Sequence, residues 1–315
     1  MNSAGGRNGS LRIGLALGSG SARGWSQIGV IRALGELGIR PDVVTGTSIG
    51  ALVGAAWVSG YLDRLESWIR DLDRVDILRL MDPHLKGGGF IRGEKLMSAL
   101  GEHVRDMNIE DMEIPFAAVA TDLASGREIW LREGSMLEAV RASIALPGIF
   151  APARVGDRWL VDGGLVNPVP VSLCRALDAD VVIAVNLNGD IVGKHLEVQG
   201  PERDPEIPES PEGIGAAITR LRMGLQLRLD SLISSVARRE ESAEPGLFDV
   251  LAGSINIVQD RITRSRMAGD PPEVIISPRL SHIRLMEFDR GAEAIRAGEE
   301  AVARIREDLE GLSGG

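Results

Sequence analysis

Short apolar runs alternate with segments of helical period along most of this chain. The runs predict buried strands at 12–17, 42–45, 116–120, 128–131, 159–161, 181–185 and 273–277. Helical spacing of apolar residues predicts helices at 28–37, 48–59, 136–143, 171–177 and 289–309. Strands and helices that alternate in this way are typical of a mainly parallel sheet with helices on both faces. The pattern therefore predicts an α/β fold with three layers, α/β/α.

One apolar stretch, residues 43–62, has no charged side chain over a length that could cross a membrane. Four glycines together with Thr45, Thr47 and Ser48 interrupt it, and Asp42 and Asp63 flank it. Long uncharged segments also occur inside α/β cores. A buried strand, a turn and a helix therefore explain this stretch better than a membrane span.

Residues 189–213 break the alternation, because they are rich in Pro, Glu and Gly and show no sustained period. This composition predicts a mobile insertion. Apolar residues then recur every three or four positions over 214–239, which predicts an amphipathic helix. That helix could be a lid or lie on a lipid interface, but its pattern favours packing on its own domain or on a second subunit. The predicted organisation is one domain over 11–309 with flexible tails at 1–10 and 310–315.

Composition and charge exclude several classes of protein. The 315 residues are 44% hydrophobic and carry a net charge of −10, with acidic and basic residues intermixed. This balance argues against a nucleic-acid-binding protein, which usually shows a basic face. The single cysteine, Cys174, excludes an internal disulfide and a cysteine-rich zinc site. Residues 1–10 lack the apolar core of a signal peptide, and we expect a cytoplasmic protein.

Ser48 lies at the centre of Gly46-Thr47-Ser48-Ile49-Gly50, between a predicted strand and a predicted helix. In a Gly-x-Ser-x-Gly elbow the serine occupies a strained turn, and the two glycines let the flanking backbone pass closely. The serine oxygen then projects at a helix N-terminus, where amide groups and the helix dipole favour negative charge. This position predicts that Ser48 is the nucleophile of an acyl-ester hydrolase. A tight structural turn is the alternative.

A glycine-rich loop at 18–24, GSGSARG, follows the first predicted strand directly. Such a loop directs several backbone N–H groups toward one point, which suits an oxyanion hole. The rival interpretation is the phosphate cradle of a dinucleotide-binding fold, but its Gly-x-Gly-x-x-Gly spacing would place the third glycine one residue earlier. The acidic residue that such a fold needs after its second strand is replaced here by the Ser48 elbow. Because acyl transfer needs both parts, the loop and the elbow together favour that chemistry.

A base for Ser48 is the third requirement. Asp162 follows a predicted strand and precedes two glycines, an arrangement that also occurs in simple turns. Histidine is the usual base of a serine hydrolase, and the chain order allows His195 or His282. Both lie in predicted loop segments without a supporting motif, so surface positions are favoured for them. The residue pattern alone leaves the base open.

Taken in order, these motifs resemble the patatin-like phospholipase family, most closely its compact bacterial RssA type. The resemblance runs over 12–304. It is carried by GSGSARG at 18–24, GTSIG at 46–50, ATDLASGR at 120–127, RASIALPGIFAPA at 141–153, VDGGLVNPVP at 161–170 and RMAGDPPEVIISP at 266–278. An ordered set of this kind is far more specific than any one motif. It implies the three-layer α/β/α fold of that family, with a mainly parallel central sheet.

The resemblance also implies a Ser–Asp dyad without histidine, in which Ser48 is the nucleophile and Asp162 the general base. An oxyanion hole would be formed by backbone amides, and no metal or organic cofactor is implied. The residues assigned to the hole are Gly18, Ser19, Gly20, Ser21 and Arg23, and those that support the elbow and the base are Gly46, Gly50, Gly163 and Gly164. Many family members have consecutive glycines where this chain has Ser19 and Ser21, and a serine adopts a positive φ at a higher cost.

We therefore expect a serine hydrolase that cleaves carboxylic esters of lipids, such as phospholipids or lysophospholipids, through an acyl-enzyme on Ser48. Burial in a closed cleft would raise the pKa of Asp162 and make it a better base. Peripheral membrane contact, a homo-oligomer and a regulatory protein partner stay open, whereas nucleic acid is not an expected partner. The alternative functions are a regulatory interaction protein of low turnover, which would bind through 189–239, and nucleotide binding at the glycine loop.

Overall fold

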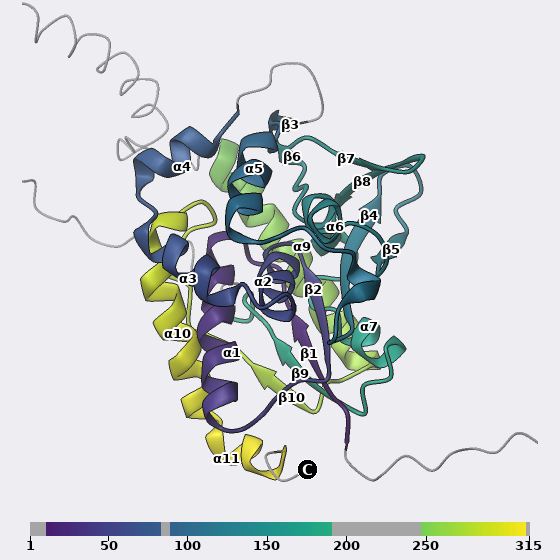
Figure 1. The fold of residues 1–315 in the computed structure, drawn as a ribbon, viewed down its shortest axis with the longest axis vertical. Coiled ribbons are helices and arrows are strands. Elements are labelled where there is room, and N and C mark those ends of the chain that lie inside the picture. The colour runs from purple at the N-terminus through teal and green to yellow at the C-terminus, as the bar shows by residue number, and fades with distance from the viewer. Residues whose placement is uncertain (1–10, 83–88, 191–246, 313–315) are drawn as a thin grey trace, which may run out of the picture. The chain divides into compact units, whose positions relative to one another are not determined.

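The computed structural model describes residues 11–82, 89–190 and 247–312 (Figure 1). Several predicted segments lie outside the described residues: the tail at 1–10, all but the first two residues of the insertion at 189–213, and the amphipathic helix at 214–239. Nearly all of 189–239, the surface that the regulatory alternative would use, is therefore outside the described residues.

The chain divides into two compact units. The first combines Met1–His195 with Ser254–Gly315, and the second is Leu196–Gly253. Every described strand belongs to the first unit. Of the second unit the structure describes only Leu247–Gly253, where a helix begins.

Eight of the described strands form one sheet. They are β1 (Ile13–Leu17), β2 (Val43–Thr47), β4 (Phe116–Asp122), β5 (Glu128–Leu131), β7 (Ala153–Val155), β8 (Arg158–Asp162), β9 (Val181–Val185) and β10 (Val274–Ile276). The strands β10, β9, β1, β2 and β4 lie side by side in that order and are parallel. The strands β5 and β8 are antiparallel to β4, and β7 is antiparallel to β8. A separate parallel pair consists of β3 (Gly89–Ile91) and β6 (Gly148–Phe150).

Helices occupy most of the connections between these strands. The α-helices are α1 (Ser26–Glu36), α2 (Ile49–Val58), α3 (Leu62–Asp71), α4 (Arg74–Leu80), α5 (Glu94–His103), α6 (Met136–Ser143), α7 (Val171–Ala176), α9 (Leu247–Gly269), α10 (Gly291–Arg304) and α11 (Arg306–Leu309). The 3-10 helices are η1 (Ser21–Trp25), η2 (Ile109–Asp111), η3 (Gly163–Leu165), η4 (Phe288–Arg290) and η5 (Glu310–Leu312).

Alternating side chains of β1 point to opposite faces of the sheet. Leu15 and Leu17 are buried in the main core, together with apolar residues of α1, α2 and α10. Ala16 is buried in a different cluster, with Val171 and Cys174 of α7. Helices therefore cover both faces of the mainly parallel sheet, and the predicted three-layer α/β/α fold is confirmed.

Two glycines bring the backbones of α1 and α10 into contact, and the two helices run side by side (Figure 1). A Cβ atom at Gly29 of α1 would lie 1.9 Å from Ile295 O, and one at Gly298 of α10 would lie 1.9 Å from Ser26 O. No real side chain tolerates such contacts, so both positions require glycine. We call these four residues the α1–α10 seam.

Several predicted elements are confirmed at both ends, namely the strands at 128–131 and 181–185 and the helix at 136–143. The long terminal helix predicted at 289–309 is wrong in its continuity, because the helix is interrupted at Ile305, which has a φ of −118°. Within the tail predicted at 310–315, Glu310–Leu312 form η5.

The uncharged stretch 43–62 folds as β2, the turn at Ser48, α2 and the start of α3. Its charge-free length thus comes from a strand and a helix that are both buried in the core. Within the described ranges, no helix is both long and apolar enough to cross a membrane.

Candidate active site

Strand pairing along one edge of β4 brings Ser48 and Asp162 together. Thr47, the last residue of β2, pairs with Val119, whereas Asp162, the last residue of β8, pairs with Ala120. The strand β5 pairs with both of these β4 residues, so it occupies the opposite edge. Parallel β2 and antiparallel β8 therefore share one edge and meet end to end, and Ser48 follows β2 directly.

The turn at Ser48 holds the backbone in an uncommon conformation. Its φ is 57°, in the left-handed region that costs a residue with a Cβ atom about 1–2 kcal/mol. The N–H of Ser48 donates to Ser143 Oγ at 2.8 Å, and this hydroxyl donates to Val119 O at 2.6 Å. Ser143, from α6, thus ties the turn to β4.

The two glycines of the elbow are required by close backbone contacts. A Cβ atom at Gly46 would lie 2.4 Å from Ala51 Cα, and one at Gly50 would lie 2.2 Å from Leu17 O. Glycine therefore lets α2 turn back tightly against β2 and lets the end of β1, where the glycine loop begins, approach the helix N-terminus.

Asp162 accepts two hydrogen bonds in a buried position. Ser48 Oγ donates to its Oδ2 at 2.6 Å, and the N–H of Gly164 donates to its Oδ1 at 2.7 Å. Only 1% of Asp162 is exposed, and burial raises the pKa of this carboxyl to about 6 although both hydrogen bonds act to lower it. A carboxylate of this pKa is ionised at neutral pH and is a better proton acceptor than an exposed one. The pair can therefore move a proton from Ser48 to Asp162.

The two glycines after Asp162 fit a crowded position. A Cβ atom at Gly163 would lie 2.2 Å from Val119 O. One at Gly164 would lie 2.4 Å from Gln259 Nε2 and 2.9 Å from Asp162 Oδ1. The Asp-Gly-Gly sequence therefore lets polar groups converge beside the carboxylate.

The glycine loop offers fewer free amides than its sequence implies. The N–H groups of Gly18 and Ser19 donate to backbone carbonyl oxygens of other segments, at 3.1 and 2.8 Å. The N–H groups of Gly20 and Ser21 have no hydrogen-bond partner among the described residues, and both residues line a cavity together with Ser48. Of the predicted oxyanion set, these two amides are available to a substrate. Ser21 has a φ of 51°, so one of the two serines in this loop does occupy a costly conformation.

Arg23, in the same loop, does not line the cavity and is 1% exposed. Its Nε donates to Gly20 O at 3.2 Å, and its Nη2 donates to Asn256 Oδ1 at 2.8 Å. No carboxylate pairs with it in the part of the chain that the structure describes. Burial lowers the pKa of this guanidinium to about 10, so it remains a cation at neutral pH. Arg23 therefore fixes Gly20 and places an unneutralised positive charge beside it.

A cavity of about 110 Å³ opens beside Ser48. Most of its described wall consists of apolar side chains from α2, α3, α4 and α5, from residues 144–150 and from residues 285–288. Apart from tryptophan, the polar side chains on this wall are Ser19, Ser21, Ser48, Asp162 and Gln259. Asp162 is the one ionisable group among the described lining residues, so this wall carries no cation for a phosphate group.

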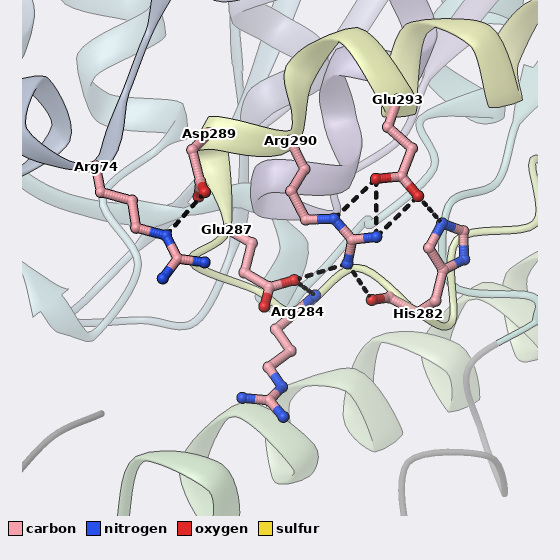
Figure 2. A network of polar contacts seen from close by, with 7 residues as sticks. All are labelled: Arg74, His282, Arg284, Glu287, Asp289, Arg290 and Glu293. Carbon is pink, nitrogen blue, oxygen red and sulfur yellow. Dashed lines mark hydrogen bonds and ion pairs between the residues drawn. The ribbon is translucent and has the colours of Figure 1, made fainter. Parts of the chain in front are cut away.

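No histidine contributes to the described wall of this cavity. The ring of His103 stacks on Trp68 with centroids 4.9 Å apart. His282, one of the two alternative bases, binds Glu293 through Nε2 at 2.9 Å (Figure 2). The other alternative, His195, lies outside the described residues. The described residues thus place a carboxylate, and no imidazole, against Ser48.

Figure 2 shows the polar network to which His282 belongs. Arg290 binds Glu293 at 2.8 Å and donates to the His282 carbonyl oxygen, while Arg74 at the start of α4 binds Asp289 of η4 at 3.0 Å. These pairs are partly exposed, so each contributes about 1 kcal/mol or less. The Arg74–Asp289 pair joins α4 to η4, and both elements line the cavity.

Helix α9 supplies site residues that the sequence analysis missed. Ile255 and Gln259 line the cavity. The buried polar residues of this helix recur at helical spacing and are at most 5% exposed: Asn256, Gln259, Asp260 and Thr263. A rule that looks for an apolar stripe on each helix does not find a helix that buries a polar one. In the sequence, the sign of this helix is the stripe of polar residues at helical spacing.

No group of three or more His, Cys, Asp or Glu side chains within the described ranges is arranged to hold a metal ion.

The sequence is similar to a protein-family model and to several known proteins. The family model described as patatin-like phospholipase matches residues 15–175. An uncharacterized NTE family protein of Mycobacterium tuberculosis is 34% identical over 341 aligned positions, which cover 96% of this chain and 93% of that protein.

Two mammalian proteins match a shorter part. Patatin-like phospholipase domain-containing protein 7 of Rattus norvegicus is 33% identical, and protein 6 of the same series from Homo sapiens is 32% identical. Each alignment covers 56% of this chain and 13% of the mammalian protein. Among solved structures, VipD from Legionella pneumophila aligns over 97% of this chain and 78% of its own with 14% identity, but its TM-score of 0.34 is too low to bear on the fold.

Proposed function

Because the chain belongs to the patatin-like phospholipase family, we propose that it hydrolyses carboxylic esters of phospholipids or lysophospholipids through a dyad of Ser48 and Asp162. The membership confirms the family resemblance of the motifs and supports lipid hydrolysis in general. The observation that carries the finer proposal is the hydrogen bond of 2.6 Å from Ser48 Oγ to Asp162 Oδ2.

The first half of the reaction acylates Ser48. Its Oγ forms a bond to the ester carbonyl carbon while its proton passes to Asp162 Oδ2. The carbonyl oxygen becomes an oxyanion and accepts hydrogen bonds from the N–H groups of Gly20 and Ser21, each typically worth about 3 kcal/mol. The buried charge of Arg23 favours the same oxyanion.

Collapse of this intermediate breaks the bond to the alcohol oxygen, and Asp162 returns its proton to the leaving alcohol. In the second half, Asp162 takes a proton from water, whose oxygen attacks the acyl carbon. The bond to Ser48 Oγ then breaks, and the proton passes from Asp162 to Ser48. One ester and one water have become one acid and one alcohol, and both residues have regained their starting states.

The cavity supports a lipid as substrate. Its described wall is mainly apolar, and it opens at the nucleophile. Each CH₂ group of an acyl chain buried there gains about 0.8 kcal/mol. This gain favours esters of fatty acids over esters of short acids.

Labelling by a fluorophosphonate probe tests the nucleophile. We expect wild type and Ser59→Ala to be labelled, because Ser59 lies at the far end of α2, and we expect Ser48→Ala to stay unlabelled and to lose lipid hydrolysis. Labelling of Ser48→Ala at the wild-type rate would refute the proposal. A Ser48→Ala protein that keeps a cellular role would favour the regulatory alternative.

A further inference from the structure

One polar side chain on the described wall of the cavity belongs to none of the sequence motifs. This is Gln259, which reaches the cavity from α9. We propose that Gln259 selects the substrate by donating a hydrogen bond to a neutral oxygen on the alcohol part of the ester. The inference rests on the proposed function, since it needs an ester bound at Ser48.

The amide of Gln259 is held in one orientation. It is 5% exposed, and its Oε1 accepts a hydrogen bond of 2.9 Å from Asn188 Nδ2, which is also buried. Its Nε2 has no hydrogen-bond partner among the described residues. Because Oε1 is fixed by Asn188, the N–H groups of Nε2 are the part of the side chain left to bind a ligand.

The position of Nε2 relative to Asp162 shows which part of an ester it meets. Nε2 lies 2.4 Å, and Asp162 Oδ1 2.9 Å, from the same point, where Gly164 would carry a Cβ atom. Both atoms therefore border the position of Gly164, and Oδ1 is the oxygen of Asp162 that does not bind Ser48. Asp162 must deliver its proton to the leaving alcohol, so the alcohol lies against Asp162 in the reacting complex. Because Gln259 and the leaving alcohol both lie beside the Asp162 carboxylate, we assign Gln259 to the alcohol part of the ester, and the free amides of Gly20 and Ser21 to the carbonyl oxygen.

The chemistry of the wall indicates what kind of atom Gln259 binds. A primary amide is a neutral donor, and the described wall has no Lys, Arg or His that could neutralise a phosphate. A hydroxyl or ester oxygen next to the scissile bond, as on glycerol, fits this environment. Esters that lack such an oxygen would leave the buried N–H groups unpaired, which is costly.

The test compares two substrates that share one acyl chain, 1-octanoylglycerol and ethyl octanoate. The measured quantity is kcat/KM for 1-octanoylglycerol divided by kcat/KM for ethyl octanoate. In Gln259→Met, which keeps the length of the side chain but has no N–H group, we expect this ratio to fall about fivefold to tenfold. Gln259→Glu keeps the acceptor for Asn188 and replaces the donor by a carboxylate oxygen, so it should lower the ratio too. The glutamate variant replaces the methionine variant in this test if the methionine variant fails to fold.

Two control variants separate substrate recognition from a structural role. Thr263→Val alters the same buried stripe of α9 one turn away from Gln259, at a residue that does not line the cavity. Asn188→Ala removes the partner of Gln259 Oε1. If Gln259 only supports the fold, Gln259→Met and Asn188→Ala should slow both substrates alike and leave the ratio at its wild-type value, and this result would overturn the inference.

Ser48→Ala distinguishes this failure from failure of the proposed function. Loss of hydrolysis of both esters in Ser48→Ala, with an unchanged ratio in both Gln259 variants, would reject the role of Gln259 alone. Hydrolysis of both esters by Ser48→Ala at the wild-type rate would overturn the dyad and the inference together.

Discussion

The sheet end that carries Ser48 and the α1–α10 seam both depend on glycines, yet the two regions use the close contacts differently. At the sheet end, Gly46 and Gly50 allow a turn in which Ser48 has a φ of 57°. In the seam, Gly29 and Gly298 allow two regular helices to touch along their backbones. The first region keeps a strained backbone and a buried carboxyl, whereas the second keeps ordinary helical geometry.

This difference predicts that activity and stability can be changed separately, by substitutions in one region or the other. Strain at Ser48 and the buried charge of Asp162 both lower the stability of the fold, and they position the reacting groups. The seam contributes packing between two helices, and none of its four residues lines the cavity. Substitutions should therefore separate the two properties, and the predictions that follow run from the largest expected effect to the smallest.

Asp162→Asn should remove catalysis and keep the fold. The amide keeps the shape of the carboxylate but cannot accept the proton of Ser48, so we expect kcat to fall by about 10⁴-fold, as in other hydrolases that lose a triad aspartate. Steady-state hydrolysis of a lysophospholipid measures this loss, and circular dichroism checks the fold. A loss of less than about tenfold would mean that Asp162 is not the base.

The pH dependence should follow the raised pKa of Asp162. Because the carboxylate form is the base, kcat/KM should rise with pH and level off above about 6, the pKa of the buried group. A profile that is flat between pH 4.5 and 7.5 would contradict this assignment.

The same raised pKa should destabilise the fold at neutral pH. Between about pH 4 and 6 the folded state holds a proton that the unfolded state releases, so the free energy of unfolding falls as pH rises. A shift from 3.8 to about 6 corresponds to about 3 kcal/mol. Asp162→Asn lacks this penalty. Urea unfolding should therefore show it gaining stability over wild type as pH rises from 4 to 7, and a difference that does not change with pH would contradict the prediction.

Two substitutions within α1 sharpen the comparison from the side of the seam. Gly29→Ala would place Cβ 1.9 Å from Ile295 O, so it should lower the free energy of unfolding by about 1–3 kcal/mol. Gly35→Ala in the same helix meets no atom within 4 Å and should raise it by about 0.5–1 kcal/mol. Chemical denaturation measures both. If both substitutions changed the free energy of unfolding equally, α1 and α10 would be able to move apart at the seam.

The smallest effect should come from the strain at Ser48 itself. Ser48→Gly and Ser48→Ala both lack the nucleophile, but only glycine adopts a φ of 57° without cost. We expect the glycine variant to be more stable by about 1 kcal/mol. At Ser59, whose φ is −87°, the same pair should show the reverse order. The melting temperatures of the four variants measure both stability differences.

Much of the fold and the two central site residues could be predicted from local pattern. Buried strands such as 181–185 are continuous apolar runs, and Ser48 and Asp162 stand at strand ends beside glycines, where a sequence motif marks them. That they lie within hydrogen-bond distance depends on which strand pairs with which residue of β4. No short-range pattern contains that information.

The features that sequence reasoning did not find depend on long-range partners. The amides of Gly18 and Ser19 are bonded to segments about 150 residues or more further along the chain, so the loop sequence alone could not show that they are occupied. Helix α9 buries a polar stripe because Arg23 and Asn188 supply its partners. The expected apolar stripe was therefore the wrong criterion for this helix.

The end-to-end meeting of β2 and β8 on β4 also determines when the protein can become active. Ser48 and Asp162 are 114 residues apart, so the dyad requires a pairing that closes a long loop, and such contacts form slowly. A nascent chain that has reached α6 contains the proposed nucleophile but not its proposed base. During refolding, helical structure should return before hydrolysis does. Under the proposed mechanism, recovered activity is thus a stringent assay for native strand order, since an incompletely folded chain lacks the assembled dyad.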